Sequence, residues 1–454
     1  MKLSLYNQIF AENKDKWIEE WKEFLRFESV STDSSYHPKC IMCAEWVKDK
    51  LQSFGFESSL YETPTKPLVL AQRKGNPNQP TFLIYGHYDV QPADPLELWK
   101  TPPFEPTIRD GKMFARGAQD NKGQIFFLMK AAETIIKTMK DDAPTIKFLI
   151  EGEEECSSIG LAAVLPDLKE KISADVLLVS DTGTIDPNYG CITVGLRGIA
   201  HMEVVLKGPN KDLHSGIHGG VVKNPITELS RIIATLHDSK GKVSVAGYYD
   251  GIRTATEKEK KLANELPLTE AWYQAQVGIA PTGGEAGLSA VERRGFRPTL
   301  EINGIYGGYM GEGMKTVIPS FAGVKLSMRL VEGQVPDSIL DSVEKHIRDV
   351  APKEMKIEII HKGFGGPALW VSPDDKYSKH AGSVLKTVMQ KDPLFMWEGA
   401  SIPIIPSLAK ASGASPLLMG FGLEEDNIHA PNESFRLQQW ERGFLSACGV
   451  LEGS

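Results

Sequence analysis

Histidine and acidic residues stand directly after short apolar stretches at several places in this sequence, and they are its best candidates for chemistry. The stretch Leu83-Ile84-Tyr85-Gly86 ends on a His-x-Asp pair, and the run Glu151-Gly152-Glu153-Glu154-Glu155 ends another apolar stretch. The candidate residues are His87, Asp120, Glu153, Glu154, Glu155, Asp181 and His429. Imidazole and carboxylate together are the ligand set of zinc, manganese or cobalt. The pattern therefore predicts a metal centre wherever the fold brings these segments together.

The apolar stretches themselves have the length of buried strands. They are residues 81–86, 145–151, 174–180 and 415–420, and amphipathic helical patterns cover residues 121–140 and 435–451. This alternation predicts an α/β catalytic domain with a largely parallel sheet flanked by helices. In such a sheet the carboxyl ends of the strands meet at one edge, which is where ligands bind. His87, the glutamate run, Asp181 and His429 all follow strands and are expected at that edge.

Each of these residues also has a purely structural interpretation. Asp120 is placed to cap a helix, the glutamate run could be a solvated turn, and a lone His429 would more often be structural. Taken together, however, the acids would bury uncompensated negative charge. Two divalent ions would more than neutralise Asp120, Glu155 and Asp181, and the remaining positive charge would suit a bridging hydroxide and a developing oxyanion.

We expect two acids, Asp89 and Glu154, to have roles other than metal binding. Asp89 points to the same side of an extended chain as His87, so we expect it to accept the second ring N–H of that histidine. Glu154 is surplus to the ligands, and hydrolysis needs one general base to take a proton from the attacking water and pass it to the leaving nitrogen. We therefore assign Glu154 to that role.

The middle of the chain predicts a second domain. Residues 198–363 follow the order β-α-β-β-α-β, which is typical of a ferredoxin-like α+β domain. We expect it to be inserted into a discontinuous catalytic domain of residues 1–197 and 364–454, with a polar insertion near 241–297. The charge run 257–261 in that insertion predicts a solvated helix face.

Composition limits the possible functions. The 454 residues carry a net charge of -8, which does not favour binding to nucleic acid or to an anionic membrane surface. No apolar run approaches the ~20 residues of a membrane span, and no secretion signal is recognisable at the start, so we expect a cytoplasmic protein. Cys40 and Cys43 form a C-x-x-C pair without a second pair, and we expect them to pack structurally.

At this point the sequence resembles the M20 family of dinuclear metallopeptidases. The matching motifs are Gly86-His87-Tyr88-Asp89-Val90-Gln91-Pro92, Arg116 to Gly123, Glu151 to Glu155, Ser180-Asp181 and His429. The resemblance implies that Asp120 bridges two metal ions, that His87 and Asp181 complete one site, and that Glu155 and His429 complete the other. It also implies a cis peptide bond after Asp120, and it agrees with Glu154 as the base.

Within that family the chain resembles the branch of cytosolic non-specific dipeptidases and carnosinases. The shared motifs are residues 195–198, 211–216, 315–319, 329–331 and 398–403. The resemblance implies that His214 stabilises the oxyanion in the partner subunit of a homodimer, and that Arg329, assisted by Thr316 and Ser401, binds the substrate carboxylate. Arg also presents a planar fork that suits a carboxylate.

The chain departs from this branch at two positions, and both concern substrate recognition. The branch usually places a histidine two residues after a glycine in the segment that follows the last strand of the second domain, whereas here Gly363 is followed by Phe364-Gly365-Gly366. The branch also often has a glycine where this sequence has Ala400. His361 lies two residues before Gly363, so either Phe364 or His361 could take the place of the missing histidine.

Other enzyme and non-enzyme classes fit less well. No Gly-x-Ser-x-Gly elbow supports serine catalysis, and a metal-binding scaffold would not need the surplus Glu154. We therefore expect metal-dependent hydrolysis of dipeptides or short peptides, with zinc as the first choice of metal and manganese or cobalt as alternatives. The alternative function is an N-acyl-amino-acid amidohydrolase or a carboxypeptidase of the same family.

Overall fold

The computed structural model describes residues 1–453, apart from the side chain of Phe364, and shows a mixed α/β protein. The chain divides into two compact units. The first comprises residues 1–194, 371–396 and 404–454, and the second comprises residues 195–370 and 397–403. Among residues 1–453, none of the helices combines the length and the hydropathy that a bilayer span requires.

The first unit is built on a sheet whose central strands are buried and parallel. The strands in this unit are β1 (Glu57–Tyr61), β2 (Leu68–Arg73), β3 (Phe82–His87), β6 (Ile146–Glu151), β7 (Val176–Val179), β17 (Ser415–Gly420) and the start of β8 (Cys191–Leu196). They lie in the order β1-β2-β6-β3-β7-β17-β8. The pairs β6–β3, β3–β7 and β7–β17 are parallel, whereas β1–β2, β2–β6 and β17–β8 are antiparallel. Parallel pairing is thus a property of the central strands, and the sheet as a whole is mixed.

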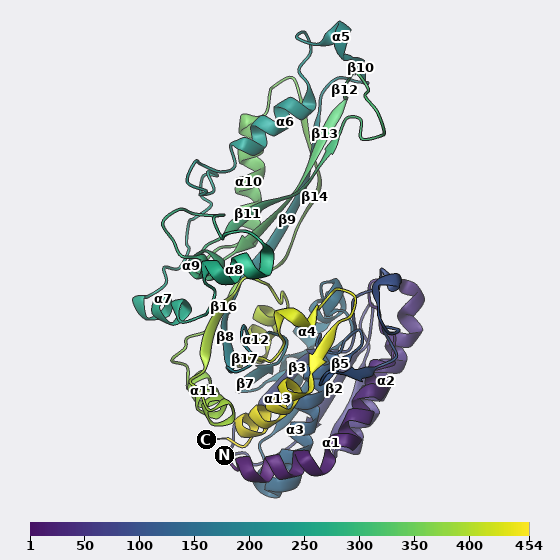
Figure 1. The fold of residues 1–454 in the computed structure, drawn as a ribbon, viewed down its shortest axis with the longest axis vertical. Coiled ribbons are helices and arrows are strands. Elements are labelled where there is room, and N and C mark those ends of the chain that lie inside the picture. The colour runs from purple at the N-terminus through teal and green to yellow at the C-terminus, as the bar shows by residue number, and fades with distance from the viewer. Residues whose placement is uncertain (454) are drawn as a thin grey trace. The chain divides into compact units, whose positions relative to one another are not determined.

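Helices cover this sheet and explain why its central strands are so apolar (Figure 1). They are α1 (Leu3–Leu25), α2 (His37–Ser53), α3 (Lys122–Met139), α4 (Ile159–Ile172), α11 (Lys376–Met389), α12 (Ile405–Ser412) and α13 (Leu437–Leu451). The α3 and α13 helices pack against each other, and α1 packs against both. Aromatic side chains fill that contact, with Trp21 stacked on Trp440 at 5.3 Å between ring centroids. Short strands β4 (Thr107–Arg109), β5 (Lys112–Phe114) and β18 (Ser434–Arg436) form a small separate sheet.

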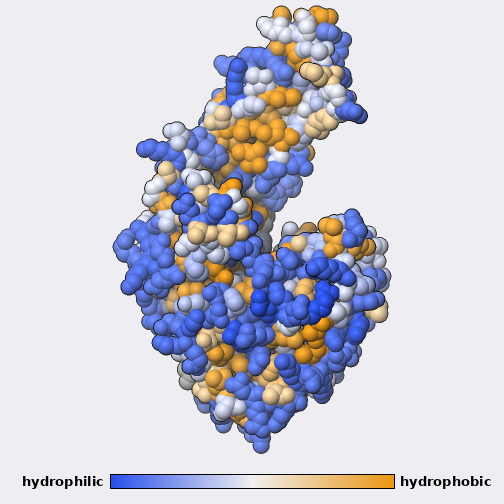
Figure 2. All heavy atoms as spheres, viewed as in Figure 1, coloured by the Kyte–Doolittle hydropathy of each residue, from blue (hydrophilic) through white to orange (hydrophobic). Residues whose placement is uncertain are grey.

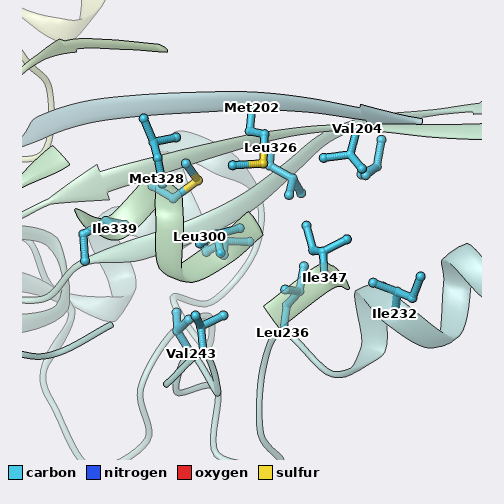
Figure 3. Close-up of a cluster of buried hydrophobic side chains, with 14 of the residues drawn as sticks. Met202, Val204, Ile232, Leu236, Val243, Leu300, Leu326, Met328, Ile339 and Ile347 are labelled. Carbon is cyan, nitrogen blue, oxygen red and sulfur yellow. The ribbon is translucent and has the colours of Figure 1, made fainter. Parts of the chain in front are cut away.

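The second unit contains a four-stranded antiparallel sheet in the order β11-β13-β9-β14. Its main elements follow the chain as β9 (Gly198–Lys207), α6 (Pro225–Ala234), β11 (Thr299–Gly307), β13 (Phe321–Leu330), α10 (Pro336–Val350) and β14 (Lys356–Gly366). Alternate residues of β9 and β13 face a core that α6 and α10 complete, and Figure 3 shows Met202, Leu326, Ile232 and Ile347 meeting there. Each such fully buried side chain contributes roughly 1.5–3 kcal/mol.

Short elements decorate this unit. They are β10 (Leu213–His214), α5 (Ser215–His218), β12 (Val317–Ile318), β15 (Leu369–Trp370) and three helices between α6 and β11, namely α7 (Glu257–Asn264), α8 (Glu270–Val277) and α9 (Ala290–Phe296). The strand β16 (Leu394–Glu398) runs from the first unit into the second. The prediction that residues 257–261 form a solvated helix face is wrong for Glu259, which is buried because Arg253 binds it through two hydrogen bonds.

Candidate metal centre

The carboxyl ends of the central parallel strands bring five ligand-type residues together in the first unit. His87 is the last residue of β3, Glu155 follows β6, Asp181 follows β7, and His429 lies in the loop after β17. Two groups form, in each of which all ligand atoms lie within 4.8 Å of one another. The groups are His87 with Asp120 and Asp181, and Asp120 with Glu155 and His429. Asp120 is the residue that the two groups share.

The carboxylate of Asp120 turns one oxygen toward each group. Its Oδ1 lies 3.2 Å from Nε2 of His87, and its Oδ2 lies 2.9 Å from Nε2 of His429. The Nε2 atom of His429 also lies 3.2 Å from Oε2 of Glu155, and Nε2 of His87 lies 3.7 Å from Oδ1 of Asp181. A carboxylate placed in this way can contact two cations at once.

The donor atoms fit divalent metal ions. Nε2 of His87 is buried and has no well-formed hydrogen bond to any described residue, although it faces two carboxylate oxygens. An imidazole nitrogen in that position, with oxygen donors beside it and no thiolate, suits zinc, manganese or cobalt. The residues therefore fit the group of ions that the sequence predicts.

Polar neighbours hold the ligands in place. Nδ1 of His87 lies 3.0 Å from the carbonyl oxygen of Asp89 and 3.3 Å from its Oδ1. Asn121 donates a 2.8 Å hydrogen bond to Oδ1 of Asp181, and Gln91 donates one of 2.8 Å to Oε2 of Glu155. The peptide bond between Asp120 and Asn121 is cis, as the resemblance implied. Sequence reasoning missed Gln91 and Asn121, although both lie within two residues of a candidate site residue.

Gly86 shows how closely these segments approach. A Cβ atom at this position would lie 2.8 Å from Oδ1 of Asn121 and 2.8 Å from Cδ1 of Ile125. Only glycine leaves room here for the start of α3, which brings Asn121 beside β3.

The electrostatics of the centre reflect an excess of buried acids. Burial raises the pKa of Glu155 to about 7, with Asp120 adding to the shift, and hydrogen bonds to Asp120 and Glu155 raise the pKa of His429 to about 10. Burial also raises the pKa of Glu154 well above its usual range, and Asp181 and Glu155 raise it further. Burial disfavours the charged form of the two glutamates, and the neighbouring carboxylates favour a bound proton on all three residues. A bound cation would compensate the same negative charge.

The three consecutive glutamates, Glu153 to Glu155, each lie in a different environment. Glu155 belongs to a ligand group, and Glu154 belongs to neither group although it is its neighbour. Glu153 is buried elsewhere, where it accepts hydrogen bonds from Oγ1 of Thr65 and from the N–H of Gly160 at 2.8 Å. Glu153 therefore anchors the first turn of α4 and is not available to a metal ion.

The remaining predicted site residues lie in the second unit. Arg329 on β13 donates a 2.9 Å hydrogen bond from Nη1 to Oγ of Ser401, and Oγ of Ser401 donates to the carbonyl of Arg197. No described carboxylate forms an ion pair with Arg329 within 4.0 Å. A guanidinium without an acidic partner remains free to bind an anion.

His214 and Thr316 lie beside each other in this unit, because β10 pairs with β12 and the N–H of Ser215 donates to the carbonyl of Thr316 at 3.0 Å. Nδ1 of His214 accepts a 3.0 Å hydrogen bond from the N–H of Gly216. The neutral ring therefore carries its proton on Nε2, and the exposed side chain can donate from that atom.

Phe364 and His361 are the two residues that could take the place of the branch's missing histidine. The side chain of Phe364 lies outside the described residues. His361 on β14 stacks on His201 of β9, with ring centroids 4.7 Å apart. Cys40 and Cys43 are both buried and free, which confirms their structural packing.

Comparison with known proteins agrees with this geometry. The model of peptidase family M20/M25/M40 matches residues 83–452. The Cys-Gly metallodipeptidase DUG1 of Candida albicans is 31% identical to this chain, and the alignment covers 97% of this chain and 95% of that protein. Human carnosine dipeptidase 1 shares the fold with a TM-score of 0.81 at 26% identity, covering 100% of this chain and 98% of that one.

A third similar protein is the M20 family metallo-carboxypeptidase Sso-CP2 of Sulfolobus solfataricus. Its structure matches with a TM-score of 0.84 at 28% identity and covers 96% of this chain and 98% of its own. The family model spans most of the chain, and it includes all five ligand-type residues. This protein belongs to peptidase family M20/M25/M40 and is a metallopeptidase that resembles the dipeptidases of that family.

Proposed function

We propose that this protein hydrolyses the amide bond of dipeptides or short peptides that carry a free carboxylate, using two divalent metal ions. The observation that carries the proposal is the placement of Asp120, whose two carboxylate oxygens face His87 and His429 separately. Zinc is our first choice of ion, with manganese or cobalt as alternatives, because all three accept imidazole and carboxylate ligands. His87, Asp120 and Asp181 would hold one ion, and Asp120, Glu155 and His429 the other.

When bound, the ions supply Lewis acidity toward water and toward the scissile carbonyl. Proton transfer is assigned to a residue of the protein. Glu154 takes a proton on its carboxylate from the attacking water and delivers it to the leaving nitrogen. The support for this role is that Glu154 lies beside the ligand Glu155 but belongs to neither ligand group.

Substrate recognition is assigned to the second unit. Arg329 binds the substrate carboxylate, assisted by Ser401 and Thr316, and His214 donates from Nε2 to the oxyanion. The support for Arg329 is its hydrogen bond to Ser401 and its lack of an acidic partner among the described residues. The support for His214 is the hydrogen bond that Nδ1 already accepts, which leaves Nε2–H as the donor.

We further propose that residues 198–363 act as a lid and dimerisation domain, inserted into a catalytic domain of residues 1–197 and 364–454, and that His214 acts in the partner subunit of a homodimer. The support is a sheet with an exposed edge strand. The β11 strand lies at one edge of its sheet, and Ile302, Ile305 and the neighbouring Phe321 of β13 are exposed there. Figure 2 shows hydrophobic side chains gathered on the surface of this unit.

One experiment separates the proposed function from its alternative. The metal-loaded protein is offered a panel of dipeptides, N-acetyl amino acids and longer peptides, and release of the free amino acid is measured. Cleavage of dipeptides at the highest kcat/KM supports the proposal. Preference for longer peptides would favour a carboxypeptidase, which the similarity to Sso-CP2 keeps as the second candidate, and preference for acyl amino acids would favour an amidohydrolase.

A further inference from the structure

An ion pair that belongs to neither ligand group lies buried beside the candidate metal centre. Nη1 of Arg116 donates a 2.8 Å hydrogen bond to Oε2 of Glu433, and the two residues are 1% and 0% exposed. A charged pair this deeply buried is costly unless its remaining hydrogen bonds are satisfied. Nε of Arg116 has no hydrogen-bond partner among the described residues, whereas the Nη groups and both carboxylate oxygens of the pair have partners, which show the segments that the pair connects.

Glu433 holds the segment that carries the shared ligand. Its Oε2 also accepts from the N–H of Gly117 at 2.8 Å, and its Oε1 accepts from the N–H groups of Gln119 at 3.0 Å and Asp120 at 3.1 Å. The N–H of Ala115 donates to the carbonyl of Glu433. The backbone that places Asp120 is thus wrapped around one carboxylate.

Arg116 connects this segment to two others. Its Nη2 donates to the carbonyl of Pro92, in the segment after His87, at 3.1 Å, and to the carbonyl of Ala430, next to His429, at 3.4 Å. Three ligand-bearing segments, namely residues 87–92, 115–120 and 429–433, therefore meet at the Arg116–Glu433 pair.

We propose that Arg116 and Glu433 are a positioning pair that fixes the separation of the two ligand groups and so allows the second ion to bind. This inference rests on the proposed two-ion centre. Two ligands of each group lie on segments that the pair contacts, namely His87 and Asp120 of the first group and Asp120 and His429 of the second. The difference between the groups therefore depends on how His429 is held. His429 is exposed and adopts φ +60°, a conformation uncommon outside glycine, so other contacts must hold it.

The first group is less dependent on the pair, because other residues hold its ligands. Asn121 donates to Asp181, and Asp89 fixes the ring of His87. Weakening the pair should therefore affect the second ion much more than the first. Groups that orient metal ligands typically change metal affinity by about 10–100-fold when they are replaced.

The test is calorimetric titration of the metal-stripped, full-length protein with manganese chloride, in the wild type, in Glu433→Gln and in Arg116→Lys. The amide of Glu433→Gln turns an NH₂ group toward backbone N–H donors. The lysine of Arg116→Lys keeps the charge but has a single nitrogen in place of the two that bind Glu433 and the two carbonyl oxygens. Circular dichroism establishes that each variant is folded, and if Glu433→Gln does not fold, Arg116→Lys decides.

Glu259→Gln is the matched control, because Glu259 is also buried, accepts two hydrogen bonds from Arg253, and accepts one from a backbone N–H. It lies in the second unit. It should lose stability as the test variants do, but bind both ions normally.

We expect two ions in the wild type and in the control, and a second ion at least tenfold weaker in both test variants. Two ions bound with unchanged affinity in the folded test variants would overturn the positioning role alone. A wild type that binds fewer than two ions would instead overturn the two-ion centre on which the role rests.

Discussion

Oδ1 of Asp89 accepts a hydrogen bond from the backbone N–H of Glu154 at 3.2 Å, so the residue that fixes the His87 ring also fixes the turn that carries the proposed base. Its Oδ2 accepts from the N–H of Glu155 at 3.2 Å. One buried carboxylate therefore sets the position of a ligand from β3 relative to a ligand and a base that follow β6.

Asp89→Asn should weaken both metal binding and catalysis. The amide retains one oxygen acceptor but turns its NH₂ group toward a backbone N–H. We expect metal affinity to fall about tenfold, together with kcat, while the circular dichroism spectrum stays unchanged. Calorimetric titration and steady-state kinetics check this, and a variant with normal affinity and normal kcat would show that Asp89 does not position the turn.

Glu154→Gln should separate catalysis from metal binding. Because Glu154 belongs to neither ligand group, the amide should leave both ions in place while removing the proton acceptor. Turnover of a dipeptide should fall by about 10²–10⁴-fold, with metal content unchanged by elemental analysis. Wild-type turnover in the metal-loaded variant would exclude Glu154 as the base, and loss of metal would make it a ligand.

Arg329→Met should raise KM for a dipeptide by about 10–100-fold, the effect of losing one charge-assisted hydrogen bond. The same dipeptide with a C-terminal amide is the control substrate, since it offers no carboxylate and should be equally poor for both enzymes. Ser401→Ala should act in the same direction with a smaller effect, because it leaves the guanidinium in place. An equal loss on the free acid and the amide would show that Arg329 does not bind the carboxylate.

His214→Ala should lower kcat by about 10²-fold, as loss of one oxyanion donor does, without loss of metal. If His214 acts across a homodimer, the His214→Ala and Glu154→Gln proteins can be mixed and allowed to exchange subunits. Each hybrid dimer then has one site with both Glu154 and His214, and one site with neither. The mixture should regain up to about a quarter of wild-type activity, from random pairing of subunits in a two-fold dimer. A mixture no more active than its two components would place His214 in the active site of its own subunit, or outside any active site.

Asp426→Asn should stabilise the protein at neutral pH. Asp426 is buried, only its Oδ2 has a hydrogen-bond partner among the described residues, and burial raises its pKa to about 7. Lys112 and Arg436 oppose this shift, and Glu425 adds to it. A raised carboxyl pKa means that the folded state keeps a proton which the unfolded state has lost. Stability therefore falls as pH rises from about 4 to about 7.

The Asp426→Asn variant has no carboxylate at this position, so its stability should not show that decrease with rising pH. The gain in Tm of Asp426→Asn over the wild type should be small at pH 5 and should reach about 2 °C or more at pH 8, as measured by thermal unfolding. An equal gain at both pH values would mean that the charge of Asp426 is not the cause.

The ligand residues could be predicted from the sequence because their types suit metal binding and their positions follow predicted strands. His87, Glu155 and Asp181 follow apolar stretches of strand length, and β17 was predicted with the bounds that the structure shows. The flanking strands β1, β2 and β8 were missed, although β8 has six buried residues, as β3 does. The direction of a strand is set by its partner, which its own sequence does not name.

The support around the site was harder to predict, because its contacts join distant parts of the chain. Arg116 and Glu433 are 317 residues apart, and neither follows a predicted strand. Glu259 lies in a run of charges that predicts a solvated face, and only the folded position of Arg253 makes it buried. Local patterns reveal residue types suited to chemistry, whereas the partners of a buried charge depend on the whole fold.

The central claim is that hydrolysis depends on the metal centre shared through Asp120. The most direct test is dipeptide hydrolysis by metal-stripped protein to which zinc or manganese is added back in steps, with Asp120→Ala treated in parallel. We predict no turnover without metal, recovery on addition of metal to the wild type, and no recovery in the variant. Turnover by the wild type that is indifferent to metal, or full recovery in Asp120→Ala, would contradict the claim.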